Sequence, residues 1–134
     1  MAALFSRPQK QFLDAAQQQQ VMTCIAEAEA RTSGEIRVFM EPKCKWVSAV
    51  DRAKEIFLQL GMEKTTMRNA VIIYLAWEDR QFALYGDKAI FEKAGGPVFW
   101  QQAAATLGQH MRQQDYANGL CACIRQLGDA LAEH

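Results

Sequence analysis

A nearly continuous apolar segment at residues 69–76 (NAVIIYLA), polar only at its first residue, Asn69, constrains the fold of this chain more than any other feature. A strand that is apolar at nearly every position is typical of a sheet covered on both faces. A turn at residues 77–80 and a second strand at residues 81–85 then predict an antiparallel hairpin. We therefore expect the run to form the central strand of a sheet with helices on both sides.

A second strand is expected earlier in the chain, at residues 35–40 (EIRVFM), where polar and apolar residues alternate. A helix follows, with Ser48 and Asp51 approximating a capping box, Val50, Ala53, Phe57 and Leu60 on its inner face, and Gly61 at its end. The order strand, helix, strand predicts a right-handed crossover between two parallel strands. A short additional strand could lie between residues 63 and 67.

Helical patterns fill the rest of the chain. One helix runs from an N-cap at Asp14 to about residue 31, and another begins at Pro97. Asp115 can cap the last helix, and a short helical turn follows Asp87. The pattern predicts an α/β protein, a three-layer α/β/α sandwich with a small mixed sheet of three to four strands and about four main helices.

Composition narrows the class of protein further. The 134 residues, half of them hydrophobic, suit one domain at residues 13–134 after a flexible N-terminal arm at residues 1–12. Fifteen basic residues balance fifteen acidic ones without clustering, so we expect no nucleic-acid partner. No membrane segment is expected, because no apolar run approaches the roughly 20 residues required. Residues 1–10 are too short and polar for a secretory signal, which predicts a cytoplasmic protein.

The cysteines and tryptophans are expected to be structural. Cys121 and Cys123 point about 200° apart on a helix, which disfavours a shared metal or a bond between them. In the reducing compartment expected for this chain, we predict that Cys121, Cys123, Cys24 and Cys44 are all reduced, unbridged thiols. The tryptophans are expected in the core or at its rim rather than as a stacking platform for single-stranded nucleic acid: Trp46, Trp77 and Trp100.

One convergent group of polar residues emerges from this fold. The hairpin brings Asp87 back beside Asn69, and a parallel first strand brings Glu35 to the same edge. Carboxylate and amide oxygens are ligands for hard cations, so these three residues are candidate metal ligands for a weakly bound Ca²⁺ or Mg²⁺. Arg68 and Ser33 at the same edge are candidates for binding an anion such as phosphate.

A purely architectural interpretation of this edge is also open. Asp87 is a good N-cap for the turn that begins at Lys88, and Asn69 can shape the start of its strand. Arg68 could simply pair with Glu35 across the edge.

The opposite edge of the sheet offers a second, weaker candidate site. Ligands of open α/β sheets usually bind at the carboxyl ends of parallel strands, and that edge carries Glu41, Glu78 and Asp79. Residues 78 and 79 also suit a solvated hairpin tip. Nucleophilic catalysis is not indicated, because Ser33 has no histidine placed to activate it and His110 lacks an obvious partner.

Five short motifs occur in order along the chain: RTSGEIRV (31–38), LGM (60–62), RNAVIIY (68–74), YGDKAI (85–90) and DYANGL (115–120). Together they resemble the TPM domain family, and most closely its short, single-domain bacterial members. The resemblance covers nearly the whole chain from about residue 12. It implies an α/β/α sandwich, a tendency to bind divalent cations and, from plant members, a phosphatase-like activity.

Two functional hypotheses follow. The first is a small divalent-cation-binding interaction module with a protein partner, because the oxygen-rich edge has no catalytic triad. The alternative is a metal-dependent, phosphatase-like hydrolase that acts on phosphomonoesters at the same edge, with Arg68 beside the carboxylates.

Overall fold

The computed structural model describes residues 12–94 and 96–134. Its sheet has the strand order β1-β2-β3, formed by β1 (Ile36–Glu41), β2 (Val71–Ala76) and β3 (Gln81–Gly86). β1 runs parallel to β2, with Ile36 aligned to Val71, and β3 runs antiparallel to β2, with Gly86 opposite Val71. The predicted central position of β2 is confirmed. The additional strand is not formed, because a 3₁₀ helix, η1 (Met62–Lys64), and a turn at residues 66–67 occupy that segment.

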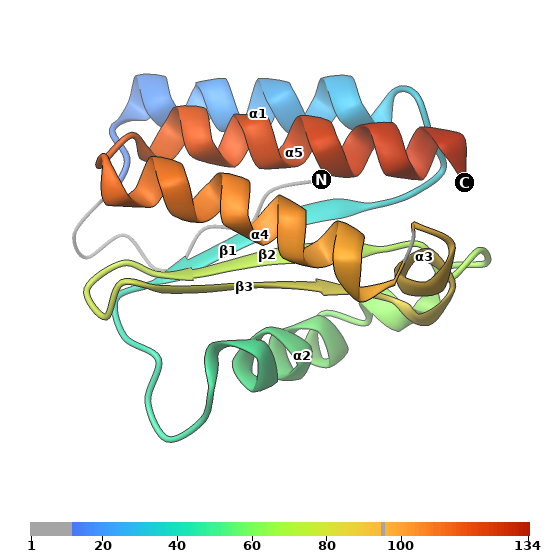
Figure 1. Cartoon of the computed structure of the whole chain (residues 1–134), viewed down its shortest axis with the longest axis horizontal. Coiled ribbons are helices and arrows are strands. Elements are labelled where there is room, and N and C mark those ends of the chain that lie inside the picture. The colour runs from blue at the N-terminus through green and yellow to red at the C-terminus, as the bar shows by residue number, and fades with distance from the viewer. Residues whose placement is uncertain (1–11, 95) are drawn as a thin grey trace.

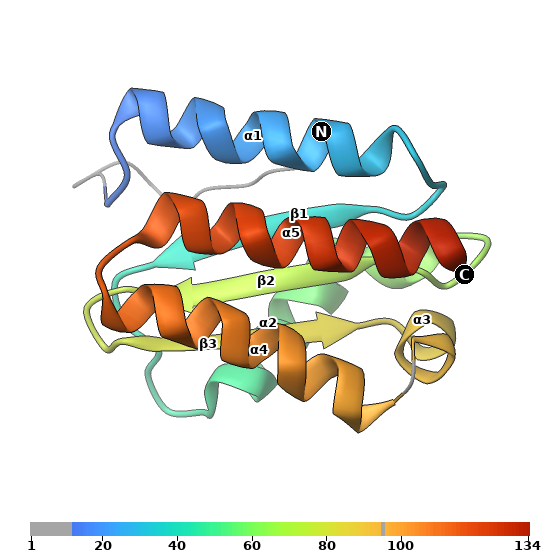
Figure 2. The same cartoon turned by 45° about the horizontal axis from the view of Figure 1, so that its top comes forward.

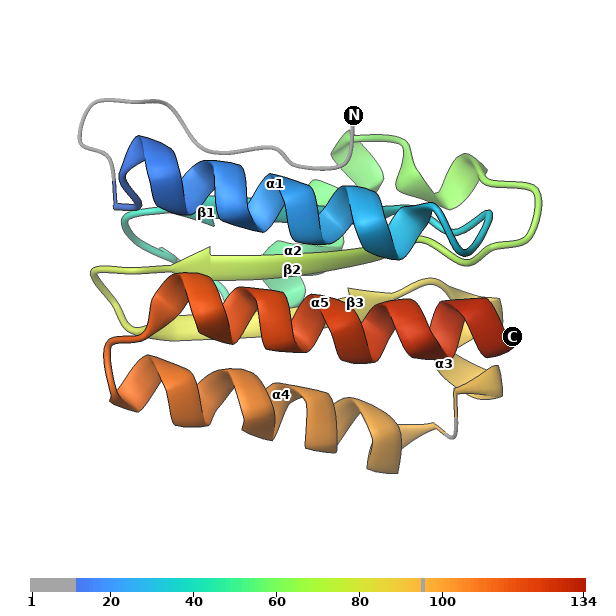
Figure 3. The same ribbon diagram turned by 90° about the horizontal axis from the view of Figure 1, so that it is seen from above.

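Helices cover both faces of the sheet, which confirms the three-layer α/β/α sandwich (Figure 1). One face carries α1 (Ala15–Glu29), α4 (Pro97–Arg112) and α5 (Tyr116–Glu133), and α5 lies between the other two (Figure 3). The opposite face carries α2 (Ala49–Gln59). The short helix α3 (Lys88–Lys93) follows β3 at one end of the sheet.

The core lies on both sides of β2, whose six residues are all buried. Ile73 contributes to the cluster beneath α1, α4 and α5, whereas Ile72 and Tyr74 contribute to the cluster with Phe57 of α2. Successive strand residues point to opposite faces, so a strand in the middle layer must be apolar at every position. This requirement explains the unbroken run in the sequence.

Two details of the helices differ from the expectations. Val50 was expected to face the core but is 54% exposed, because the buried positions of α2 are Ala53, Ile56 and Phe57. Asp115 occupies the N-cap position of α5 without capping it through its side chain, and Asp115 Oδ1 instead accepts a hydrogen bond from Asn118 Nδ2 at 2.9 Å.

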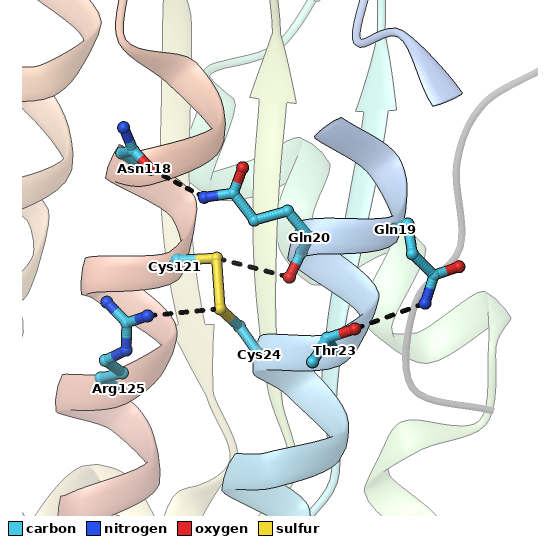
Figure 4. The surroundings of a disulfide bond; sticks show 7 residues. All are labelled: Gln19, Gln20, Thr23, Cys24, Asn118, Cys121 and Arg125. Atoms are coloured by element: carbon cyan, nitrogen blue, oxygen red, sulfur yellow. Dashed lines mark hydrogen bonds between the residues drawn. A yellow bond between two sulfur atoms is a disulfide. The ribbon is translucent and has the colours of Figure 1, made fainter. Parts of the chain in front are cut away.

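A disulfide between Cys24 of α1 and Cys121 of α5 contradicts the prediction of four reduced thiols (Figure 4). The Cα atoms are 5.7 Å apart although the residues are 97 positions apart in the sequence. Cys121 and Cys123 are indeed not bonded to each other, but that spacing says nothing about a pair on two different helices. Only the packing of α1 against α5 brings Cys24 to Cys121, while Cys44 and Cys123 stay free.

The surroundings of the disulfide also join these two helices. Gln20 Nε2 donates a hydrogen bond to Asn118 Oδ1 at 2.7 Å, and Arg125 Nη2 lies 3.7 Å from Cys24 Sγ (Figure 4). The contact between α1 and α5 therefore combines one covalent bond with polar side-chain contacts from both helices.

Trp46 is the tryptophan for which the expectation was wrong, since it is 97% exposed on the loop between β1 and α2. Trp100 is buried and Trp77 is half-buried, as expected. Of the predicted arm at residues 1–12, all but Phe12 lies outside the described residues. Within residues 12–94 and 96–134, none of the helices combines the length and apolar character that a membrane crossing needs.

Candidate functional site

The turn before β2 positions the first two candidate residues, Arg68 and Asn69. Arg68 has a φ of 52°, in the left-handed region that residues with a side chain seldom adopt. The backbone N–H groups of both residues turn back toward Thr65, to its carbonyl oxygen and its hydroxyl, each at 3.3 Å. The two adjacent side chains then reach different partners, Asp87 for Arg68 and Ser33 for Asn69.

Asp87 lies at the end of β3, where its N–H donates to Ala70 O at 2.9 Å. Its carboxylate is 3% exposed and receives a bidentate guanidinium, with Arg68 Nε at 2.7 Å from Oδ2 and Arg68 Nη2 at 2.8 Å from Oδ1. Asp87 Oδ1 also accepts from Lys88 N at 2.7 Å, which confirms Asp87 as the N-cap of α3. Arg68 therefore pairs with Asp87 and not, as the architectural interpretation supposed, with Glu35.

These contacts set the charge of the Asp87 carboxyl group. Burial raises its pKa, but the hydrogen bonds from Arg68 and Lys88 N–H, with the positive charge of Arg68, lower it by more. The net result is a pKa below the ordinary value, so Asp87 is ionised at neutral pH.

Asn69 forms the second contact of the edge. Its Nδ2 donates to Ser33 Oγ at 3.2 Å, while its Oδ1 is buried and has no hydrogen-bond partner among the described residues. The Asn69 residue is 9% exposed. A Cβ at Gly34 would lie 3.0 Å from Asn69 O and 2.8 Å from Leu131 Cδ2, so glycine allows the loop after α1 to pack closely here.

Glu35 lies apart from this group. Its carboxylate pairs with Arg37, with Arg37 Nη2 and Nε at 2.9 and 3.0 Å from Oε2. Strand alternation places Glu35 and Arg37 with Phe39, a residue that packs into the cluster beneath α2. The structure thus brings Ser33, Asn69, Arg68 and Asp87 together in two neighbouring contacts and gives Glu35 a separate ion pair.

Glu29 is a polar residue of this region that the sequence analysis missed. Its Oε2 accepts a hydrogen bond from Ile36 N, the first residue of β1, at 2.8 Å. Burial raises the pKa of the Glu29 carboxyl, the Ile36 N–H lowers it and the nearby charge of Glu35 raises it, with a net upward shift. No sequence signal marks Glu29, because its role depends on how α1 lies over the edge strand.

At the opposite edge, the second candidate site is divided among structural contacts. Glu41 receives Arg52 Nε and Nη2 at 2.9 and 3.0 Å and also accepts a hydrogen bond from the Tyr74 hydroxyl. Asp79 Oδ2 accepts from Cys44 N at 2.8 Å, which holds the loop after β1, and Glu78 is exposed. Burial raises the pKa of Glu41, but the hydrogen bonds from Arg52 and Tyr74 bring it below the ordinary value.

Comparison with known proteins assigns the chain to a family. The family model of the TPM domain matches residues 7–130. The chain belongs to the TPM domain family. No curated protein sequence matches this TPM domain.

Solved structures show the same fold. The NMR structure of the BA42 protein from the psychrophilic bacterium Bizionia argentinensis is 36% identical, with a TM-score of 0.85, covering 96% of this TPM domain and 86% of that chain. The N-terminal domain of cg2496 from Corynebacterium glutamicum is 17% identical, with a TM-score of 0.74 over 97% and 79% of the two chains. An N-terminal domain from P. gingivalis is 14% identical, with a TM-score of 0.75 over 97% and 81%.

The side chains at the Arg68–Asp87 edge of this TPM domain offer oxygen atoms as possible metal ligands. Within the part of the chain that the structure describes, no group of three His, Cys, Asp or Glu side chains is placed to hold a metal ion. The orphaned Asn69 Oδ1 and the Asp87 carboxylate are oxygen donors of the kind that Ca²⁺ and Mg²⁺ accept. These residues fit a hard cation whose shell is completed mainly by water.

Histidine chemistry is not part of this edge. His110 lies on α4, with its Nδ1 3.0 Å from Thr106 O, a distance at which the ring N–H donates to that carbonyl. This contact lies within one helix and gives the His110 ring a backbone partner.

Proposed function

We propose that this chain is a divalent-cation-binding interaction module and that Asn69 and Asp87 supply the protein ligands. The observation that supports the proposal is the buried Asn69 Oδ1, which has no hydrogen-bond partner among the described residues. A buried carbonyl oxygen without a partner is costly, and a bound cation would satisfy it. Asp87, whose backbone N–H donates to the carbonyl of Ala70 next to Asn69, would supply the negative charge.

The Asp87 carboxylate retains one position for such a cation. An ionised carboxylate can accept about four hydrogen bonds, two at each oxygen. The Oδ1 atom accepts from Arg68 Nη2 and Lys88 N, whereas Oδ2 accepts only from Arg68 Nε. The remaining capacity at Oδ2, together with Asn69 Oδ1, favours a site with few protein ligands and therefore weak affinity.

Arg68 would oppose cation binding, because its guanidinium already neutralises Asp87. The arginine side chain is 48% exposed whereas that of Asp87 is 4% exposed, so loss of the arginine contact leaves a buried carboxylate that a cation could neutralise in its place. Removal of the positive charge should therefore tighten cation binding, whereas removal of the Asp87 charge should weaken it.

A titration with Ca²⁺ or Mg²⁺, followed by amide NMR, tests the site. We expect saturable shifts near residues 33–35, 68–70 and 85–88, with a Kd of about 10⁻⁴–10⁻³ M, typical of loosely built oxygen sites. Asp87→Asn should weaken binding, and Arg68→Gln should strengthen it. Glu35→Gln is the matched comparison and decides whether the predicted third ligand joins the site. Shifts centred on Glu41 and residues 78–80 would contradict the assignment.

A metal-dependent, phosphatase-like activity is the second candidate. The family model carries the name TPM_phosphatase, and Arg68 keeps three of its five N–H donors free for a phosphate oxygen. Ser33 is exposed at the same edge and could donate its hydroxyl proton to that anion. Turnover of p-nitrophenyl phosphate with Mg²⁺, Mn²⁺ or Ca²⁺ that disappears in Asp87→Asn would favour the hydrolase. Cation binding without turnover would favour the module.

A protein partner in the cytoplasm completes the proposal. The loop between β1 and α2 exposes Trp46 at 97% and Val47 at 41%, and Val50 at the start of α2 is 54% exposed. Exposed tryptophan is rare on free surfaces and common at the energetic centres of interfaces. Cross-linking in cells should capture a partner with the parent protein and less of it with Trp46→Ala, and cell fractionation should recover the protein in the cytoplasm.

A further inference from the structure

A cavity of about 300 Å³ lies at the end of the molecule opposite the Arg68–Asp87 edge. Its lining residues come from the β2–β3 hairpin, the end of α4 and the start of α5. These three segments lie at the same end of the molecule in Figures 1 and 2. Leu75 and Gly108 are among its buried lining residues. Its place at the carboxyl end of β2 is where open α/β sheets usually bind ligands, and its volume is at the lower end for small-molecule pockets.

Three aromatic rings form much of the wall of this cavity: Trp77, Phe82 and Tyr116. Phe12 contacts two of them, with ring centroids 5.3 Å from Trp77 and 4.4 Å from Tyr116. This packing fixes the two rings relative to each other. A preformed aromatic wall suits a planar apolar group, because aromatic rings prefer offset-stacked or edge-to-face contacts with other rings.

Two arginines border the same cavity, Arg80 from the hairpin and Arg112 from the last turn of α4. The arginines at positions 31, 37, 52 and 68 each pair with a carboxylate, whereas Arg80 and Arg112 form no ion pair with any described residue. Residues 1–11 and 95 contain no Asp or Glu and so cannot supply the missing carboxylate. No carboxylate lines the cavity either.

Gly108 allows the Arg112 guanidinium and the Phe82 ring of the aromatic wall to lie against the same part of α4. A Cβ at this position would lie 3.3 Å from Phe82 Cζ and 3.6 Å from Arg112 Nη1, so the bare helix surface admits both groups. Glycine is unfavourable in the middle of a helix, but at this position the missing side chain allows close packing. Here a ring and a guanidinium both lie against the helix backbone.

We propose that this cavity binds a small organic anion with an aromatic body, of the class of aryl carboxylates. The carboxylate would accept hydrogen bonds from Arg80 and Arg112, whose planar forks match its geometry. The ring would pack among Trp77, Phe82 and Tyr116. This site is separate from the proposed cation site and does not depend on it.

An NMR titration of the full chain with 3-phenylpropionate tests the proposal. We expect saturable shifts at residues 75–82 and 108–116, with a Kd of about 10⁻⁴–10⁻³ M for a ligand of this size. Two reference ligands separate the contributions: 3-phenylpropan-1-ol lacks the charge and inorganic phosphate lacks the ring. Each should bind at least about tenfold more weakly, since each loses one of the two sets of contacts.

Variants then connect binding to the named residues. The double variant Arg80→Gln/Arg112→Gln should weaken 3-phenylpropionate binding about tenfold or more, because it removes the charge-assisted hydrogen bonds. Lys54→Gln, an exposed change on α2 across the sheet, should leave binding unchanged. Gly108→Ala should also weaken binding, because its Cβ would lie 3.3 Å from Phe82 Cζ and displace a ring of the cavity wall, while α4 should remain helical because alanine favours helix.

Three results would overturn the proposal. They are the absence of saturable binding up to about 10 mM, equal affinity for the alcohol or phosphate, and full affinity in the double arginine variant.

Discussion

At the scale of single residues, the Arg68–Asp87 pair links the end of the sheet to its surroundings. Asp87 is 3% exposed, caps α3 and holds Arg68 in a bidentate pair. Because the pKa of Asp87 is lowered, the folded state stabilises the ionised carboxylate of this residue relative to the unfolded state.

The pH dependence of stability follows from this shift. The Asp87 contribution is complete above its unfolded pKa of about 3.9 and is lost as the pH falls through its lower folded pKa. Asp87→Asn should therefore lower the free energy of unfolding by about 1–2 kcal/mol at pH 7, with a smaller difference at pH 3. Urea unfolding at both pH values measures this difference. Asp129→Asn, at an exposed ion pair, is the control and should differ little at either pH.

At the scale of elements, β2 determines the layers of the fold. All its residues are buried, and its two faces supply different clusters, one beneath α1, α4 and α5 and the other beneath α2. A defect in this strand therefore affects one layer directly and the strand pairing of both neighbours.

Ile73→Ala should show this central role. Ile73 is fully buried, so the truncation leaves a cavity that should lower the free energy of unfolding by about 2–5 kcal/mol. Val98→Ala, at a side chain that is 63% exposed, is the comparison and should change stability by less than about 0.5 kcal/mol. An unchanged unfolding midpoint for Ile73→Ala would contradict a central β2.

At the scale of the whole molecule, the Cys24–Cys121 disulfide joins the first long helix to the last. The bond closes a loop of 97 residues that contains the entire sheet, so it restricts the unfolded chain across nearly all of its length. It therefore acts on global stability rather than on one local contact.

Reduction of the disulfide should destabilise the whole domain. We expect a reductant to lower the free energy of unfolding by about 2–4 kcal/mol, measured by denaturant titration with and without it. Cys44→Ser should keep this sensitivity, whereas Cys121→Ser should lack it. A thiol count on denatured, unreduced protein should find two free thiols, and a count of four would show that the bond is absent.

The candidate site was only partly predictable from the sequence. The positions of Asn69 and Asp87 followed from the hairpin, because an antiparallel return fixes which residues meet at its open end. The partner of Arg68 did not follow, since both Glu35 and Asp87 are within reach of a long side chain. Arg68, in its left-handed turn, pairs with Asp87, whereas the alternation of β1 places Glu35 beside Arg37, with which it pairs.

The strand order, the parallel and antiparallel pairings and the three layers followed from the amino-acid pattern, because hydrophobic periodicity and turn residues act over short distances along the chain. Three features needed the folded structure: the bond between Cys24 and Cys121, the hydrogen bond from the first N–H of β1 to Glu29, and the exposure of Trp46. The cavity bordered by Arg80 and Arg112 belongs to the same group. Each of these features depends on how helices distant in the sequence lie against the sheet and one another, and no local pattern records that arrangement.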